Sequence, residues 1–153
     1  MELSRDYSID PVLLLKEYGL RITPQRISIL SHMNQYKMHL TAEQIYHAIK
    51  DEFPSLSVAT VYNTLKAFID AGFVKELRVG DHASKFDLNL IPHHHLVCEK
   101  CGHIEDFHFI DLPIDKIANM HNFHVRHYHL EINGLCANCQ EGHPSYIHQN
   151  QIS

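Results

Sequence analysis

The chain has 153 residues, of which 44% are hydrophobic, and a formal net charge of −5 at pH 7. This length and apolar share fit one compact domain or two small ones with a buried core. The acidic balance argues against a strongly basic nucleic-acid binder, and no apolar run reaches membrane-spanning length.

Charge and histidine are unevenly distributed along the chain. Residues 1–90 carry ten Lys and Arg against eleven Asp and Glu, whereas residues 91–153 carry three against seven. Nine of the fifteen His fall between positions 93 and 129. The first part is therefore compatible with DNA contact through a local patch, and the acidic, His-rich second part suits cations.

The N-terminal stretch MELSRDYSID lacks a basic region followed by an apolar segment, so we expect no secretory signal and a cytoplasmic protein. Four cysteines in that reducing compartment are metal ligands more often than disulfide partners.

Four helices are predicted in the first half of the chain. Cap-then-proline pairs at Asp10-Pro11 and Thr23-Pro24 begin the first two, and a T-x-x-Q capping box at Thr41 begins the third. Ser57 caps the fourth helix, and Gly72 ends it. The predicted helices cover residues 10–18, 23–33, 41–53 and 57–72.

A β-hairpin follows the helices, with strands at 73–79 and 84–90 joined at Gly80-Asp81. Helices followed by a hairpin are typical of a winged helix, a helix-turn-helix variant whose last helix before the wing enters a DNA major groove. Residues 1–90 are therefore predicted to form a winged-helix DNA-binding domain.

After Pro92 the pattern predicts a small α/β domain over residues 91–153, and the fold class is α+β. Strands are expected at 96–100, 103–109 and 123–134, and a helix is expected at 112–121. The last residues, EGHPSYIHQNQIS, form a polar C-terminal tail.

Two CxxC motifs, Cys98-x-x-Cys101 and Cys136-x-x-Cys139, predict a metal site. Two cysteines three positions apart on a tight turn can direct both thiolates at one tetrahedral centre, and a second turn completes the ligand set that structural Zn²⁺ prefers. The alternatives are two buried dithiols or one redox-active CxxC, although redox motifs of this kind occur singly.

Histidines and carboxylates offer a second, mixed ligand set. Alternation along a strand places His93 and His95 on one face and His94 on the other, and Asp106 in the next strand could reach the same pocket. Asp87 and His39 could add two more ligands from the first domain. Such a set suits Fe²⁺, Mn²⁺ or Zn²⁺. On spacing alone, these residues are more often solvated surface groups than ligands.

Six motifs resemble the ferric uptake regulator (Fur) family, and most closely its peroxide-sensing PerR branch. The motifs are RITPQR (21–26), HLTAEQIY (39–46), SVATVYNTL (57–65), GDHASKFDL (80–88), HHHLVCEKCGHIEDF (93–107) and LEINGLCANC (130–139). They occur in the family's order and extend over most of the chain.

The resemblance implies a homodimeric, metal-dependent repressor that binds an inverted repeat in double-stranded DNA, with the C-terminal α/β domain as the dimerisation domain. It implies structural Zn²⁺ at the four cysteines and regulatory Fe²⁺ or Mn²⁺ at the second set. The regulatory ligands carried over by position are His39, Asp87, His93, His95 and Asp106.

The resemblance also assigns DNA contacts to Arg21, Tyr62 and Asn63. A Tyr62 ring could contact a thymine methyl group, and an Asn63 amide could pair with an adenine edge. Tyr62 could instead be a core aromatic, but it lies beside the apolar stripe of its helix rather than on it, which favours exposure.

Two residues favour the peroxide-sensing branch. Asn63 stands where iron-uptake regulators of the family usually carry Arg, and Asp106 stands where they usually carry Glu. In the peroxide-sensing branch, Fe²⁺ and hydrogen peroxide oxidise the ligand histidines that correspond here to His39 and His93.

Other functions compete with this interpretation. An iron- or zinc-uptake repressor of the same family is the first alternative, and a hydrolytic metalloenzyme is a weaker one. We expect no enzyme activity, because no general base stands apart from the proposed ligands. A third metal site near His127 or His129 and pairing of dimers into tetramers stay open.

Overall fold

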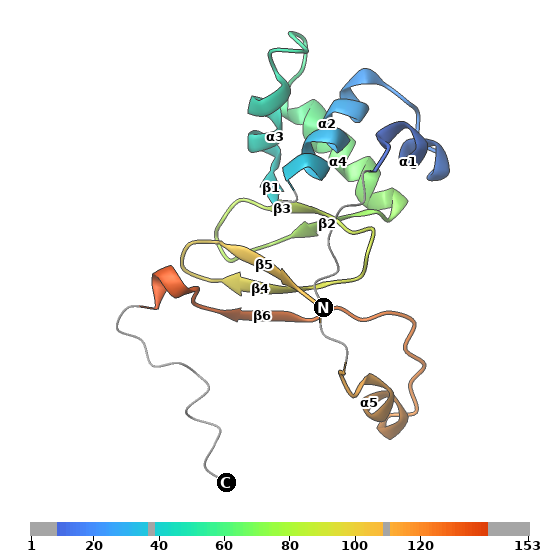
Figure 1. Ribbon diagram of the computed structural model, residues 1–153, viewed down its shortest axis with the longest axis vertical. Helices are drawn as coiled ribbons and strands as arrows, with labels where there is room; N and C mark the ends of the chain where they lie inside the picture. The colour runs from blue at the N-terminus through green and yellow to red at the C-terminus, as the bar shows by residue number, and fades with distance from the viewer. Residues whose placement is uncertain (1–8, 37–38, 109–110, 141–153) are drawn as a thin grey trace. The chain divides into compact units, whose positions relative to one another are not determined.

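The computed structural model describes residues 9–36, 39–108 and 111–140 (Figure 1). The chain divides into two compact units. Unit 1 comprises Met1–Arg78 and Ala83–Leu90, and unit 2 comprises Val79–His82 and Ile91–Ser153. The predicted C-terminal tail lies outside the described residues. Every helix in the described part is too short or too polar to span a bilayer.

Four helices of unit 1 pack above a small sheet (Figure 1). They are α1 (Pro11–Glu17), α2 (Pro24–Tyr36), α3 (Ala42–Ile49) and α4 (Val58–Ala71).

The predicted caps begin these helices. Asp10 accepts hydrogen bonds from the N–H groups of Val12 and Leu13 at the start of α1, and Thr41 forms the capping box with Gln44 at the start of α3. Ser57 caps α4, and Gly72 ends it in the left-handed conformation, with φ 99°.

The sheet of unit 1 has the order β1-β3-β2 and is antiparallel. The predicted hairpin forms from β2 (Val74–Leu77) and β3 (Lys85–Leu88). The two-residue strand β1 (Leu40–Thr41) adds to β3 immediately before α3 begins. Helices and hairpin together make the predicted winged helix.

The core of unit 1 is one continuous apolar cluster contributed by all four helices and the sheet. Phe68 of α4 and Phe73 just after it are fully buried, and their ring centroids are 5.1 Å apart. This core fixes α4 with one apolar face inward and leaves its opposite face to solvent.

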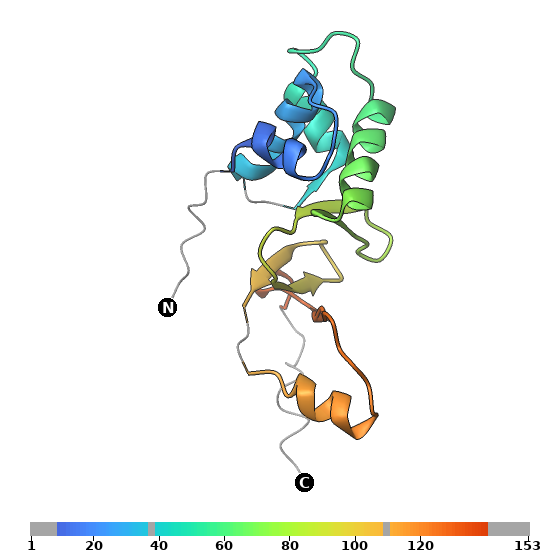
Figure 2. The ribbon, with the colours of Figure 1, turned by 90° about the vertical axis from the view of Figure 1, so that its right-hand side faces the viewer.

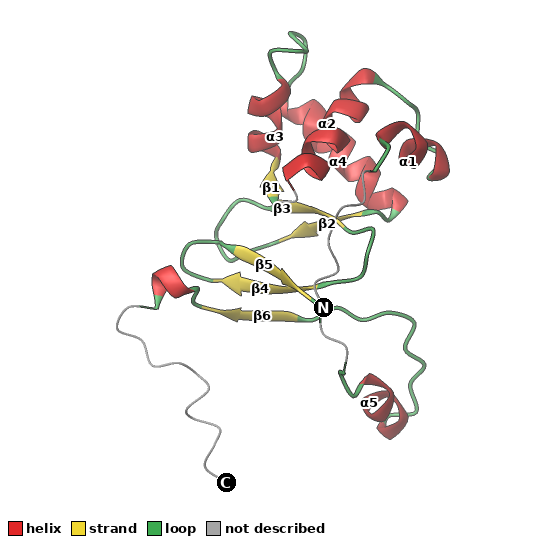
Figure 3. Ribbon diagram, in the orientation of Figure 1, coloured by secondary structure: helices red, strands yellow, loops and turns green. Residues whose placement is uncertain are grey.

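Unit 2 contains a three-stranded sheet of order β5-β4-β6. The central strand β4 (His94–Cys98) pairs antiparallel with β5 (Ile104–Phe107) and parallel with β6 (Glu131–Gly134). The short helix α5 (Ile114–Met120) lies away from the sheet (Figure 2), and the 3-10 turn η1 (Ala137–Cys139) follows β6. Figure 3 shows how little of this unit is helical.

Three predicted ranges differ from the structure by three or more residues at one end. The last strand begins at Glu131 rather than at residue 123, because only residues from 131 onward have a ladder partner, in β4. Helix α3 ends at Ile49, four residues before the predicted end, and turns follow it. Helix α2 continues to Tyr36 instead of ending at residue 33.

Candidate metal centres and nucleic-acid interface

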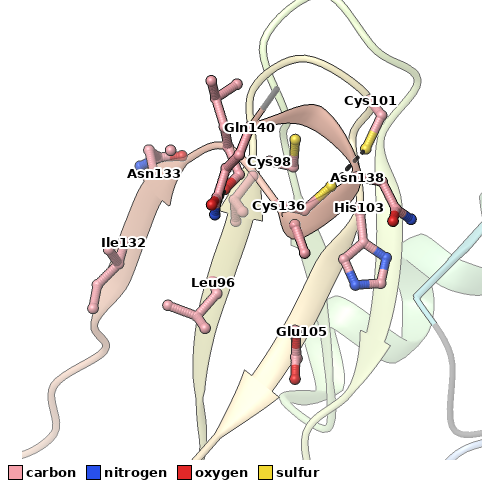
Figure 4. Close-up of a pocket in the computed structure, with 14 residues that line it drawn as sticks. Leu96, Cys98, Cys101, His103, Glu105, Ile132, Asn133, Cys136, Asn138 and Gln140 are labelled. Atoms are coloured by element: carbon pink, nitrogen blue, oxygen red, sulfur yellow. Dashed lines mark hydrogen bonds between the residues drawn. The ribbon is translucent and has the colours of Figure 1, made fainter. Parts of the chain in front are cut away.

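The four cysteines converge in unit 2 at the end of β4, and Figure 4 shows three of them, Cys98, Cys101 and Cys136. Cys98 ends β4, and the tight turn after it is closed by the Gly102 N–H, which donates to the Cys98 carbonyl at 2.9 Å. Gly102 adopts φ +74°, which glycine allows without strain. A second turn, in η1, is closed by the Cys139 N–H donating to the Cys136 carbonyl at 2.8 Å.

The sulfur geometry fits a tetrahedral zinc ion. All four Sγ atoms lie within 4.8 Å of one another, and the Cys101 and Cys136 sulfurs are 3.7 Å apart. Zn–S bonds of about 2.3 Å in a tetrahedron place sulfurs about 3.8 Å apart. The donor set and the spacing therefore fit structural Zn²⁺.

The thiols of this cluster differ in acidity. Backbone N–H groups of Cys136 and Cys101 lower the pKa of Cys98 to about 6. Burial and the neighbouring thiols raise the pKa of Cys139 to about 12. Cys98 is therefore a ready thiolate, and a bound cation would stabilise the thiolate form of Cys139.

Three of the predicted regulatory ligands meet at the other end of β4. The Nε2 atoms of His93 and His95 lie 3.7 and 3.3 Å from Oδ1 of Asp106. Register explains the contact, because His95 stands directly opposite Asp106 in β5 and His93 shares its face. All three side chains are at most 8% exposed. His94 faces elsewhere, as alternation predicts.

The other two predicted regulatory ligands form a pair within unit 1. Nε2 of His39 lies 3.5 Å from Oδ1 of Asp87, and both side chains are less than a tenth exposed. His39 immediately precedes β1, and Asp87 lies in β3, so the β1–β3 pairing brings them together.

The spacing of the nitrogen and oxygen atoms in both sets is that of neighbouring ligands around a divalent metal ion. Bonds of about 2.0–2.2 Å from imidazole nitrogen or carboxylate oxygen place neighbouring ligand atoms roughly 3–3.5 Å apart. The separations of 3.3, 3.5 and 3.7 Å in the two sets are close to that value. The His93 Nδ1 atom lies 2.8 Å from the Ile91 carbonyl oxygen, a contact that directs Nε2 at Asp106.

Several remaining histidines pack against other side chains. The His94 ring stacks on Tyr128 with centroids 5.4 Å apart, and its Nδ1 accepts a hydrogen bond from the Leu130 N–H. His129 lies against His95, a contact that sequence reasoning did not assign, although the His-rich run around it was the available signal.

The candidate DNA contacts on α4 are exposed. Tyr62 is 38% exposed and Asn63 lies beside it on the solvent face, so the core-aromatic alternative for Tyr62 is wrong. The Tyr62 hydroxyl donates to Oε1 of Glu43 at 3.2 Å, and its ring packs edge-on against Phe86. Burial and the Glu43 charge raise the pKa of Tyr62. Glu43 is a partner that sequence reasoning missed.

Arg21 lies in the exposed connection between α1 and α2. Its carbonyl oxygen accepts a hydrogen bond from the Arg26 guanidinium at 3.0 Å, which fixes the backbone there. The Arg21 side chain is exposed, as a residue that contacts DNA must be.

Comparison with known proteins gives a consistent result. Residues 17–133 match the profile of the Ferric uptake regulator family. The "Peroxide-responsive repressor PerR" of Staphylococcus aureus (strain Mu50) is 45% identical over 134 residues, covering 86% of this chain and 90% of that one. The chain belongs to the ferric uptake regulator family.

Solved structures agree in fold. The Campylobacter jejuni peroxide stress regulator is 31% identical with a TM-score of 0.67, covering 86% of this chain and all of that one. An iron-containing ferric uptake regulator from Francisella tularensis is 28% identical with a TM-score of 0.69, covering 82% and 98%. The chain is thus a metal-binding repressor of this family, with an α+β fold in which the winged helix comes first.

Proposed function

We propose that this repressor uses the cysteine cluster for permanent Zn²⁺ and both histidine–aspartate sets for one exchangeable Fe²⁺ or Mn²⁺ ion. The observation that carries the proposal is the convergence of His93, His95 and Asp106, with two imidazole nitrogens facing one buried carboxylate oxygen. Buried imidazole and carboxylate ligands suit Fe²⁺ and Mn²⁺ better than a softer ion.

In the proposal, His39 and Asp87 of unit 1 complete the ligand set of this ion. Three ligands from unit 2 leave positions for further donors on an ion that takes five or six, and the unit 1 pair has the same chemistry and burial. An ion held by both units favours one arrangement of the two and so biases the equilibrium toward the DNA-binding state.

Peroxide is the proposed signal. Bound Fe²⁺ would supply the redox chemistry that activates hydrogen peroxide, and in the net reaction the imidazole loses two electrons to the peroxide. One peroxide oxygen adds to the imidazole of His39 or His93 and the other leaves as water, so the ring gains one oxygen atom. The altered ring is a poorer ligand, the bias toward the DNA-binding state is lost with the ion, and DNA is released. The oxidised histidine is not regenerated in this proposal. Each subunit therefore reacts once, without catalytic turnover.

DNA recognition is assigned to α4, with Tyr62 and Asn63 at base edges and Arg21 in the minor groove. Exposure of all three residues supports this assignment. Tyr62 is held in place by Glu43 and Phe86, so little rotamer entropy is lost when DNA binds. We place this activity in the cytoplasm, on a double-stranded inverted repeat.

A homodimer is the proposed binding unit. Ile117, Met120 and Phe123 on and after α5 are 53%, 73% and 69% exposed, and Leu96 and Ile132 on the sheet are 40% and 46% exposed. The sheet residues line a hollow of about 550 Å³ (Figure 4). Exposed apolar side chains of this size, on and after α5 and on the sheet, are typical of a subunit interface. Changing both Met120 and Phe123 to Asp is expected to yield monomers in sedimentation measurements.

Mass spectrometry tests the sensor. The protein is loaded with Fe²⁺ or Mn²⁺, bound to a duplex that the Mn²⁺ form selects from random DNA, and exposed to hydrogen peroxide. We expect one added oxygen on peptides holding His39 or His93, together with DNA release, in the Fe²⁺ form alone. The exposed His47 serves as an internal control in both forms.

Two results would change the proposal. DNA binding that does not depend on the metal would contradict the proposal that metal controls repression. Metal-dependent binding that persists under peroxide, with His39 and His93 unmodified, would favour an iron-uptake repressor, which the iron-containing relative makes the second candidate.

A further inference from the structure

The two ring nitrogens of His95 have different surroundings. Its side chain is 1% exposed, and Nε2 faces Asp106 at 3.3 Å. The other nitrogen, Nδ1, lies 3.5 Å from Nε2 of His129, and the two ring centroids are 5.0 Å apart at an angle of 56°. His129 thus approaches His95 from the side opposite the candidate ligand atom.

The residues on both sides of His129 contact β4, Leu130 through its backbone and Tyr128 through its ring. The His95 N–H donates to the Leu130 carbonyl at 3.1 Å, and the Leu130 N–H donates to His94 Nδ1 at 3.2 Å. The ring of Tyr128 stacks on His94 with an interplanar angle of 26°. Because its neighbours on both sides are held, His129 lies at a defined position beside His95.

The two ligand imidazoles of unit 2 are therefore supported in different ways. His93 has a backbone carbonyl, that of Ile91, 2.8 Å from its Nδ1. His95 has the side chain of His129 at the same place on its ring. The outer partner of a metal-binding imidazole fixes its tautomer and orientation and raises its basicity, and losing such a partner typically costs about 10–100-fold in metal affinity.

We propose that His129 is a positioning residue for the regulatory metal. Its Nε2 accepts a hydrogen bond from His95 Nδ1, which keeps the proton off His95 Nε2 and directs that atom toward the ion. His129 itself does not bind the ion. This inference rests on the proposed function of His93, His95 and Asp106 as metal ligands.

The test measures Mn²⁺ affinity of the full-length protein by competition with a chelator. His129→Ala is expected to weaken binding about tenfold, since one outer partner is lost. His129→Gln places an amide oxygen near the position of Nε2 and is expected to recover most of that loss. His127→Ala, at an exposed position in the same segment, is the matched control and should bind as the unaltered protein does.

Two further readouts separate positioning from other roles. Zinc content and thermal unfolding of the Mn²⁺-free variants should be unchanged, and the visible absorption bands of Co²⁺ at the regulatory site should keep their positions in His129→Ala. Unchanged Mn²⁺ affinity in His129→Ala would overturn the inference. Shifted Co²⁺ bands without recovery in His129→Gln would overturn it too, because His129 would then be a ligand.

A reference variant separates failure of this inference from failure of the proposed function. His95→Ala is expected to abolish Mn²⁺ binding. If His95→Ala binds Mn²⁺ normally, the proposed metal site is wrong, and the role of His129 is wrong with it. If His95→Ala loses binding but His129→Ala does not, the metal site stands and the positioning role alone is refuted.

Discussion

Unit 1 buries sixteen apolar side chains of its described part in one cluster, whereas the described part of unit 2 buries five, namely Val79, Val97, Cys98, Ile104 and Ala118. Unit 1 is thus stabilised by ordinary core packing. Unit 2 has too small a core for that, and small domains of this kind usually need a metal or a partner subunit. We propose that zinc at the cysteine cluster and a partner subunit at the exposed apolar residues around α5 stabilise unit 2.

Removing the zinc site should have the largest effect, and it should be confined to unit 2. Cys98→Ser is expected to lose zinc and with it most of a binding free energy that is about 10–16 kcal/mol in structural sites. Hydrogen exchange should report loss of protection in β4, β5 and β6 while α4 stays protected. Lys100→Ala, an exposed position between the two cysteines, is the control.

Truncating a core side chain of unit 1 should have the opposite result and destabilise unit 1 rather than unit 2. Phe68→Ala in α4 removes a fully buried ring and is expected to cost about 3–5 kcal/mol in unit 1. Unit 1 should then lose protection from exchange while zinc content stays unchanged. Lys66→Ala on the exposed face of the same helix should change the free energy of unfolding by less than about 1 kcal/mol. Loss of zinc from Phe68→Ala would show that the two units do not fold independently.

A smaller change tests the turn that holds the first cysteine pair. Gly102 has φ +74°, and a Cβ there would lie 3.3 Å from the His82 ring. Gly102→Ala is therefore expected to cost about 1–2 kcal/mol and to speed zinc release to a chelator. Gly134→Ala, where a Cβ would have nothing within 4 Å, is the matched control. Equal rates of zinc release from both variants would argue against backbone strain at position 102.

The smallest expected effect concerns the helix assigned to DNA. Ser57 accepts a hydrogen bond from the Thr60 N–H at 3.1 Å, and Ser57→Ala should cost about 1 kcal/mol of unit 1 stability. Denaturant unfolding measures the loss, and the exposed Ser55→Ala serves as the comparison. Zinc content should be the same in both, and any decrease in Ser57→Ala would contradict separate stabilisation of the units.

The sequence alone was sufficient wherever a local rule decides the structure. Asp10, Thr41 and Ser57 begin helices because their side chains satisfy N–H groups a few residues away. The period of two along a strand placed His93 and His95 together and His94 apart. The paired CxxC turns and the hairpin likewise depend on neighbours in the chain.

Tertiary structure decided what depends on distant residues. The last strand is short because pairing with β4 begins at Glu131, and no local pattern marks that point. Residues 79–82 group with unit 2, through contacts such as that of His82 with Gly102, although they lie within the hairpin of unit 1. His129 reaches His95 across 34 positions of sequence. Local propensity determines which elements form, whereas packing between them determines which side chains meet, and that is why the contact of His129 with His95 emerged from the fold alone.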